Sequence, residues 1–329
     1  MNENQDAAVD VVVIGGGAAG LSGAVTLARS RRSVVVVDAG EPRNAPAAGV
    51  HALLGREGIA PAELLERGRA ELEGYGGTIL RGEVVRAAAD ADGFAVTLAD
   101  GRAMRARRLL VTTGLVDELP AVPGLRERWG RDVLHCPYCH GWEVRDRAIG
   151  ILATTPTSVH QALLFRQLSD DVVYFAAGVG MPEAEDAEKL QARGIRIIEG
   201  EITGLHIVDD RLSAVRLSDG AVIARDALAV GPRMVARSAV FDDLGLQPTT
   251  HPMGEFIAVD ATGRTAVAGV WAAGNVSDLS AQVGMAAAQG TFAAAQLNAD
   301  LVAEDVQIAV TRHRERGKME AWSASRTSP

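Results

Sequence analysis

Hydrophobic residues near the N-terminus fall into two short β-branched runs separated by a segment of small residues. Residues 9–14 read VDVVVI, and residues 33–38 read SVVVVD. Continuous apolar runs of this length are typical of buried parallel strands, which are covered on both faces. The stretch LSGAVTLARS at residues 21–30 lies between them and has the small and apolar composition of a helix that packs closely on a sheet. The pattern therefore predicts a βαβ unit.

Glycines occupy the turn after the first run in the spacing Gly15-x-Gly17-x-x-Gly20. In a dinucleotide-binding βαβ unit the first glycine makes the tight turn, the second lets the backbone approach a pyrophosphate, and the third allows close packing of helix on strand. Asp38 ends the second run, where an acidic side chain binds a ribose hydroxyl. Strand, helix, second strand and terminal acid all occur in order, which disfavours a chance glycine-rich turn. The motif itself does not distinguish FAD from NAD(P).

Further strand-like runs occur later in the chain. Residues 107–111, RRLLV, lead to Thr113 and Gly114, and residues 148–152, AIGIL, precede a second turn. Residues 269–301 read as a strand, a glycine turn and a long helix of small residues. Because one domain usually takes about 100–200 residues, a chain of 329 residues is expected to form two domains. The fold class predicted is α/β, with two Rossmann-like nucleotide-binding units.

Composition excludes several classes of partner. The chain is 47% hydrophobic, which is enough for a sizeable core, and carries a net charge of −9. A negative charge disfavours nucleic acid and anionic membrane as partners, and 4% aromatic residues are few for base stacking. We find no apolar stretch of about 18 residues that would span a bilayer, and no basic and apolar leader in the first ten residues. We expect a cytoplasmic protein.

The chain contains only two cysteines, and they form one Cys-x-x-Cys, Cys136 and Cys139. Thiols are kept reduced in the cytoplasm, so such a pair is metal-binding or redox-active more often than it is a structural staple. Zinc needs about four converging ligands, and His135 and His140 are each directly adjacent to a cysteine, which makes convergence awkward. An inert buried pair is a further alternative. We therefore expect dithiol–disulfide chemistry and no metal site.

These motifs together resemble the low-molecular-weight thioredoxin reductase family of flavoproteins. The likeness extends from about residue 9 to about residue 301 and includes the Thr113-Gly114 segment before the cysteine pair and the AAGN segment that ends at Asn275. The resemblance implies that FAD is the cofactor and that the protein forms a homodimer. It also implies an FAD-binding domain built from residues 1–117 and 235–329. A smaller domain, residues 118–234, is inserted between these parts and carries the Cys-x-x-Cys.

The resemblance also assigns the residues that line the flavin. They are Gly15, Gly17, Gly20, Asp38, Thr113, Gly114, Asn275, Gln282 and Val283. The family usually has aspartate where this chain has Asn275, so a contact with the ribityl chain would be made by a neutral amide. Asn44 and His51 lie in the loop after the second strand and are expected near the isoalloxazine, although an ordinary polar loop would read the same way.

The second nucleotide turn, in the inserted domain, departs from the family pattern. Ala153, Thr155 and Ser158 stand at the three small-residue positions, and Pro156 is added inside the turn. Side chains at the first two positions would crowd a pyrophosphate, and proline removes a backbone N–H from the cradle. The next strand, DDVVYF, is followed by Ala-Ala-Gly and then by acidic residues, where the family has a basic cluster. We expect a degenerate NAD(P)H site, the alternative being an unconventional mode of NADPH binding.

An intact cysteine pair with a degenerate nicotinamide site resembles the dithiol oxidases that close disulfides in natural products of the gliotoxin and holomycin type. This resemblance implies a small-molecule dithiol substrate, O₂ as acceptor and H₂O₂ as product. By family position Cys136 faces the substrate and Cys139 faces the flavin, and His140 is the expected base, unless it only caps or packs. His135 is a weaker candidate base, for which a structural role is favoured.

Two other functions are compatible with the sequence. One is a thioredoxin-type disulfide reductase fed by ferredoxin or through an atypical NAD(P)H site, which the degenerate turn disfavours. The other is a flavin-dependent redox sensor without enzymatic activity, which the absence of an attached DNA-binding or partner-binding module disfavours.

Overall fold

The predicted N-terminal βαβ unit forms as expected. Strand β1 (Val9–Ile14), helix α1 (Ala18–Arg29) and strand β2 (Val34–Asp38) follow in order, and β1 pairs with β2 in parallel. The computed structural model describes residues 8–326, so both ends of the predicted FAD-binding domain, residues 1–7 and 327–329, lie outside the described residues. The valines of β1 at positions 11–13 are fully buried, because the sheet is covered on both faces.

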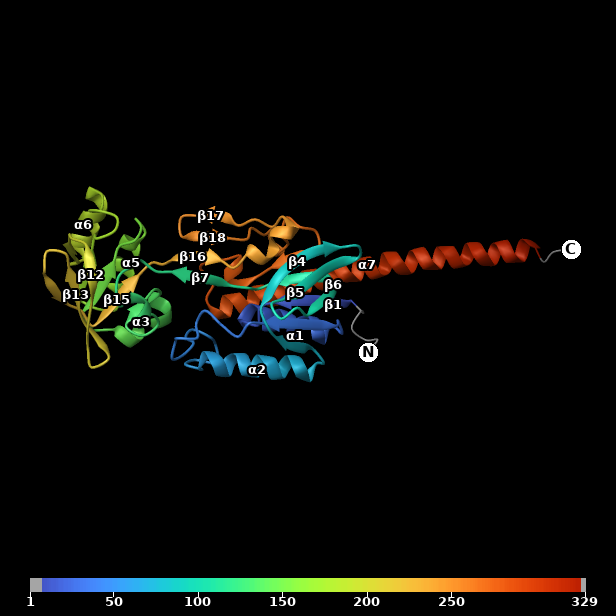
Figure 1. Cartoon of the computed structure of the whole chain (residues 1–329), viewed down its shortest axis with the longest axis horizontal. Helices are drawn as coiled ribbons and strands as arrows, with labels where there is room; N and C mark the ends of the chain where they lie inside the picture. Colours follow the sequence, from blue (N-terminus) through green and yellow to red (C-terminus); the bar gives the residue numbers. More distant parts are fainter. Residues whose placement is uncertain (1–7, 327–329) are drawn as a thin grey trace.

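The first sheet combines strands from both ends of the chain (Figure 1). Its strand order is β3-β2-β1-β6-β5-β4, and β19 pairs with β6 in parallel. Strands β4, β5 and β6 are joined antiparallel, while β1, β2, β3 and β6 are parallel neighbours. The strands added here are β3 (Thr78–Arg81), β4 (Val84–Asp90), β5 (Gly93–Leu98), β6 (Ala103–Val111) and β19 (Val270–Ala272).

Glycines bring helix α1 into close contact with its neighbours. A Cβ atom at Gly20 would lie 1.9 Å from the carbonyl oxygen of Gly15, and one at Gly290 would lie 2.0 Å from the carbonyl oxygen of Ala19. Neither position accepts a side chain, so α1 approaches both the turn before it and the C-terminal helix α7 (Val283–Arg326). The third glycine of the motif therefore has the packing role that the sequence predicts.

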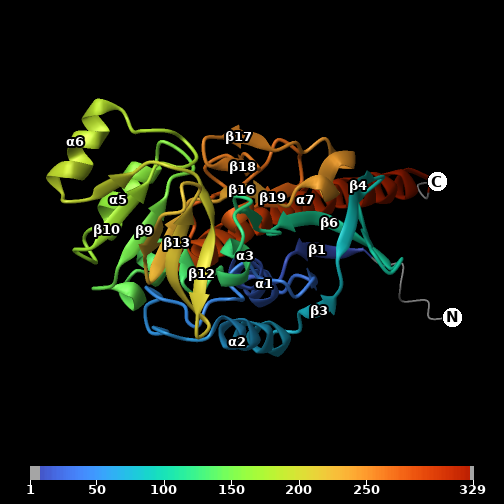
Figure 2. The ribbon, with the colours of Figure 1, turned by 60° about the vertical axis from the view of Figure 1, so that its left-hand side comes forward.

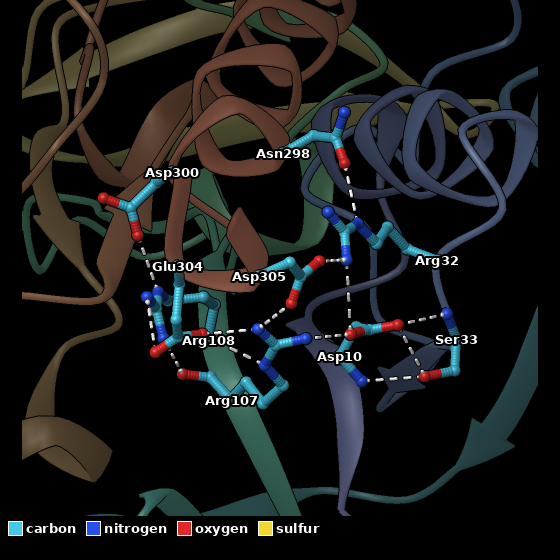
Figure 3. A network of polar contacts seen from close by, with 9 residues as sticks. All are labelled: Asp10, Arg32, Ser33, Arg107, Arg108, Asn298, Asp300, Glu304 and Asp305. Carbon is cyan, nitrogen blue, oxygen red and sulfur yellow. Dashed lines mark hydrogen bonds and ion pairs between the residues drawn. The ribbon is translucent and has the colours of Figure 1, made fainter. Parts of the chain in front are cut away.

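Helix α7 spans 44 residues and is fastened to the sheet by an ionic network (Figure 3). Arg107 Nη1 donates to Asp10 Oδ1 at 2.9 Å, and its Nη2 donates to Asp305 Oδ1 at 2.6 Å. Arg32 Nη1 donates to Asp305 Oδ2 at 2.7 Å, and hydrogen bonding to Arg32 and Arg107 lowers the pKa of Asp305. Beyond this network α7 projects away from the body of the molecule (Figure 1). Within residues 8–326, no helix has the length and apolar character that a membrane span requires.

A second, parallel sheet lies to one side of the first (Figures 1 and 2). Its order is β11-β10-β9-β15-β8, and helices α5 (Ser158–Phe165) and α6 (Ala184–Ala192) follow β9 and β10. Its strands are β8 (Val133–Leu134), β9 (Ile149–Leu152), β10 (Val172–Phe175), β11 (Arg196–Ile198) and β15 (Ala227–Val230). Strands β12 (Ile202–Val208), β13 (Arg211–Leu217) and β14 (Val222–Ala224) form a separate antiparallel sheet.

Two antiparallel strands connect the two parts of the molecule. Strand β7 (Leu115–Glu118) leads toward the second sheet, and β16 (Arg233–Ala236) returns from it, with Asp117 opposite Met234. Strands β17 (Thr249–His251) and β18 (Gly254–Phe256) extend this pair into a four-stranded sheet. The predicted domain limits, after residues 117 and 234, fall inside β7 and β16 and stay a prediction.

Candidate active site

A cavity of about 1370 Å³ extends from the first βαβ turn to the two cysteines. All but one of the residues predicted to form the site line this cavity. They are Gly15, Gly17, Asp38, Asn44, His51, Thr113, Gly114, Cys136, Cys139, His140, Asn275, Gln282 and Val283. The exception is Gly20, which packs on Gly15 beneath the start of α1. The cavity exceeds the 300–1,000 Å³ or so of ordinary small-ligand pockets, as a site for a dinucleotide and a substrate should.

The turn before α1 has the shape that a dinucleotide requires. Gly17 is the N-cap of α1 and makes no side-chain cap, and a Cβ atom there would meet nothing within 4 Å. The first N–H groups of the helix therefore face an open space, where a phosphate is favoured by hydrogen bonding and by the helix dipole. A Cβ atom at Gly16 would lie 2.5 Å from Cγ of Asp38, so the carboxylate lies directly against the turn. These residues fit the adenosine and pyrophosphate of FAD.

The side chain of Asn275 makes hydrogen bonds within the protein. Its Nδ2 donates to the carbonyl oxygens of Asp278 at 3.0 Å and Ala281 at 2.9 Å. Its Oδ1 accepts from Arg43 Nη1 at 3.2 Å. Both hydrogens of Nδ2 are thus hydrogen-bonded, and Oδ1 is the one side-chain atom that can accept a further hydrogen bond. A ribityl hydroxyl could therefore be bound by donating to Asn275, as it would donate to an aspartate.

Arg43 and Asp117 form an ion pair that the sequence did not reveal. Arg43 Nε and Nη2 donate to the two carboxylate oxygens of Asp117 at 2.7 and 2.6 Å, and the Asp117 side chain is only 7% exposed. Asp117 lies on β7, so the pair joins the loop after β2 to the connection between the sheets. Neither residue has a local signal for this role, because the partners are 74 positions apart.

His51 lies between two carboxylates at the edge of the cavity. Its Nδ1 is 2.6 Å from Glu57 Oε1, and its Nε2 is 3.5 Å from Glu143 Oε1. The hydrogen bond from His51 lowers the pKa of Glu57. Glu143 follows the cysteine pair, in the short helix η1 (Trp142–Val144). His51 therefore links the loop after β2 to the cysteine segment.

Cys136 and Cys139 form a disulfide with their Cα atoms 5.2 Å apart. Cys136 is the N-cap of the one-turn helix α4 (Pro137–His140), and its carbonyl oxygen accepts from the backbone N–H of Cys139 and of His140. Tyr138 and Trp142 beside it are each 66% exposed. In the described part of the chain, no three His, Cys, Asp or Glu side chains are grouped so that they could hold a metal ion.

Two histidines flank the disulfide in different settings. Burial lowers the pKa of both His135 and His140, so each favours the neutral form that can act as a base. His135 Nδ1 lies 3.2 Å from the carbonyl oxygen of Val230. His140 Nε2 is buried and has no hydrogen-bond partner among the described residues.

The second nucleotide turn is closed by its own side chains. Ser158 Oγ accepts from the backbone N–H of Thr154 at 3.1 Å and of Thr155 at 3.4 Å, and Ser158 is 2% exposed. Thr154 Oγ1 donates to the carbonyl oxygen of Gly231 at 2.7 Å. The backbone N–H groups of Thr154 and Thr155 are thus already paired within the turn. Beyond β10 and β11, a smaller cavity of about 320 Å³ contains Glu199 and Glu201, whose charge disfavours a phosphate.

Comparison with known proteins agrees with this architecture. The profile of the pyridine nucleotide-disulphide oxidoreductase family matches residues 9–290. The chain is 33% identical to "Thioredoxin reductase tcpT" of Claviceps purpurea and 30% identical to "Thioredoxin reductase sirT" of Leptosphaeria maculans, covering 90% of this chain and 95% of each relative.

Solved structures show the same likeness. The crystal structure of HlmI superposes with a TM-score of 0.88 at 48% identity, covering 94% of this chain and 97% of that chain. The structure of the Bacillus anthracis protein described as "Putative Thioredoxin Reductase TrxB" superposes with a TM-score of 0.85 at 28% identity, covering 90% of this chain and 99% of that chain. The chain therefore belongs to the pyridine nucleotide-disulphide oxidoreductase family, as a thioredoxin reductase-like, FAD-binding thiol–disulfide oxidoreductase.

Proposed function

We propose that this chain is an FAD-dependent dithiol oxidase that forms a disulfide in a small-molecule dithiol and uses O₂ as acceptor, releasing H₂O₂. One observation carries the proposal. The disulfide of Cys136 and Cys139 shares a cavity with the dinucleotide turn of α1, whereas the turn that would bind a nicotinamide cofactor is capped by Ser158. Electrons can enter through the disulfide, and the hydrogen bonds within the second turn disfavour the usual route from NAD(P)H.

The chain is more similar to HlmI than to the thioredoxin reductase-like structure from Bacillus anthracis. The identity to HlmI, 48%, is well above the 28% to the Bacillus anthracis protein described as a thioredoxin reductase. The motifs themselves resemble the dithiol oxidases of the gliotoxin and holomycin type, and on that basis we extend a role in natural-product biosynthesis to this chain. By family resemblance we propose that the enzyme is a homodimer, and from the sequence pattern we propose that it is cytoplasmic.

Different residues are proposed to bind FAD and to carry out the thiol chemistry. Gly15, Gly17 and Asp38 would hold the adenosine diphosphate part of FAD, and Thr113, Gly114, Asn275, Gln282 and Val283 the flavin part, with Asn44 and His51 at its edge. FAD, when bound, accepts two electrons from a thiolate and can pass them to oxygen. The protein supplies the disulfide that collects those electrons from the substrate and the bases that ionise the substrate thiols.

Thiol–disulfide exchange then proceeds by two attacks. A substrate thiolate attacks Cys136 Sγ, the bond between Cys136 and Cys139 breaks, and Cys139 leaves with the electron pair. The second substrate thiolate attacks the substrate sulfur bound to Cys136, which forms the substrate disulfide and releases Cys136 as a thiolate. His140 is the proposed base for this second thiol, since burial lowers its pKa and keeps it neutral near pH 7.

The test compares two electron donors. Under anaerobic conditions dithiothreitol should bleach the bound FAD readily, and NADPH or NADH should do so slowly or not at all. In air, O₂ uptake with a dithiol should be matched by H₂O₂. Rapid stoichiometric bleaching by NADPH would restore the alternative function, a thioredoxin-type disulfide reductase with an atypical NAD(P)H site, and reduction by ferredoxin alone would point to the ferredoxin-fed version.

The two cysteines give matched variants of the same test. Cys136→Ser should leave Cys139 as an unpaired thiolate and retain a long-wavelength charge-transfer band with oxidised FAD, whereas Cys139→Ser should lose the band. Both should lose turnover by orders of magnitude, because an essential nucleophile or its relay is removed. O₂ uptake that persists in both variants would mean that the substrate is oxidised without the disulfide.

A further inference from the structure

We propose that His135 is a second general base of the dithiol reaction, which ionises the substrate thiol that attacks Cys136. The inference rests on the proposed function and deepens it, because a dithiol has two thiols to ionise and His140 was assigned to only one. His135 directly precedes Cys136 in the chain, and both residues line the cavity.

The hydrogen bond of His135 determines which ring nitrogen is basic. Its Nδ1 lies 3.2 Å from the carbonyl oxygen of Val230, and a carbonyl oxygen can only accept. In the neutral ring the hydrogen is therefore on Nδ1, and Nε2 carries the free lone pair. Val230 is the last residue of β15, an internal strand that pairs with β9 and β8, so the acceptor belongs to the sheet backbone.

The backbone of His135 is held from a second direction. Gln161 Nε2, from helix α5, donates to the carbonyl oxygen of His135 at 2.7 Å. The ring and the main chain are thus fixed by β15 and α5 together, which is what a base with a defined direction requires. The one side-chain hydrogen bond of the His135 ring within the described residues is made by Nδ1, so Nε2 is free to take a proton.

The charges that face His135 leave the ring neutral. In the described structure they are Arg43, from the loop after β2, and Asp117, from β7. Their bidentate ion pair largely cancels both charges at the ring. A neutral imidazole beside a compensated ion pair accepts a proton more readily than one beside a lone arginine, and it does not hold a proton permanently as one beside a lone carboxylate would.

The step can be written with all protons and electrons assigned. Nε2 of His135 takes the proton of the first substrate thiol, and the thiolate forms a bond to Cys136 Sγ as the bond from Cys136 to Cys139 breaks. Cys139 keeps the electron pair. When the second substrate thiol closes the substrate disulfide, Cys136 leaves as a thiolate and receives the proton from His135. The proton of the second thiol goes to His140.

The experiment uses His135→Asn in the full-length, FAD-loaded protein. The Asn Nδ2 can replace Nδ1 as donor to Val230, while no base remains at the position of Nε2. With dithiothreitol as probe, anaerobic flavin bleaching at pH 6.5 should be slower than in the wild type by about 10²–10⁴-fold. The deficit should shrink as the pH rises toward a thiol pKa of about 8.5. An aromatic dithiol that is already ionised should be oxidised at nearly the wild-type rate.

A merely structural role would give a different result. It would slow both dithiols equally at every pH, and that outcome, or a wild-type pH–rate profile, would overturn the proposal. If the His135→Asn variant binds no FAD, nitrogen NMR of the wild-type protein tests the proposal instead. A neutral His135 ring with its hydrogen on Nε2 would overturn the proposal. Failure of the proposed function can be told apart from failure of this inference, because dithiols would then not bleach the flavin even in the wild-type protein.

Discussion

Replacing Asn275 by aspartate, the residue usual at this position in the family, should destabilise the protein. The Asn275 amide donates two hydrogen bonds, to the carbonyl oxygens of Asp278 at 3.0 Å and Ala281 at 2.9 Å. A carboxylate cannot donate either bond and would face both oxygens. Each lost bond costs about 1 kcal/mol, and leaving the two carbonyls unpaired adds about 1 kcal/mol or more. A carboxylate would attract Arg43 more strongly, since Arg43 Nη1 lies 3.2 Å from Oδ1, and this attraction offsets about 1 kcal/mol of the lost stability.

The net expectation is a loss of about 2–3 kcal/mol in the free energy of unfolding. Urea denaturation of the FAD-loaded protein, followed by circular dichroism and by the release of flavin fluorescence, measures it. A matched control is Asn298→Asp, because the contact of Asn298 with Arg32 is made by its oxygen: Oδ1 accepts from Arg32 Nε at 2.8 Å (Figure 3). There an aspartate retains the contact and adds an ion pair, so stability should be unchanged or higher. Equal effects of the two substitutions would refute the assigned orientation of the Asn275 amide.

Other predictions concern the second turn, the buried ion pair and pH. Ser158→Ala removes the acceptor of the Thr154 and Thr155 N–H groups and should lower the free energy of unfolding, measured by thermal denaturation, by about 1 kcal/mol. It should create no NADPH-dependent bleaching, and gain of such bleaching would contradict the closure of the second turn by its own side chains. Arg43→Gln leaves the Asp117 carboxylate buried and unpaired and should cost about 3–5 kcal/mol, most of which Asp117→Asn should recover in the double variant; additive losses in urea titrations would argue against the pair. Because burial lowers the pKa of His140 in the folded state, the unfolded chain binds the proton more tightly, and stability should fall as the pH drops below about 6.5. His140→Asn should reduce that slope, and an unchanged slope in melting experiments would exclude the effect.

The local pattern of the sequence was sufficient to predict the elements that frame the site. The runs at residues 9–14 and 33–38 form β1 and β2, and Gly20 permits the close packing that its place in the motif implies. Such predictions succeed because strand burial, helix formation and a tight turn depend on residues that are near one another in the chain. The departure at residues 153–158 was also visible, because a proline and side chains in place of glycines alter a turn locally.

The partners of the site residues were decided by tertiary structure. Arg43 meets Asp117 across 74 positions and Asn275 across 232, and His135 meets Val230 across 95. No spacing rule relates residues this far apart, because their contact depends on how two sheets and the strands between them are arranged in space. The sequence by itself determined that this chain has a dinucleotide turn, a Cys-x-x-Cys and a second turn without the glycines of the motif. Only the fold determined which groups are already paired, and therefore which atoms remain free to bind FAD or to take a proton: a side chain that is hydrogen-bonded to its own protein is no longer available for chemistry.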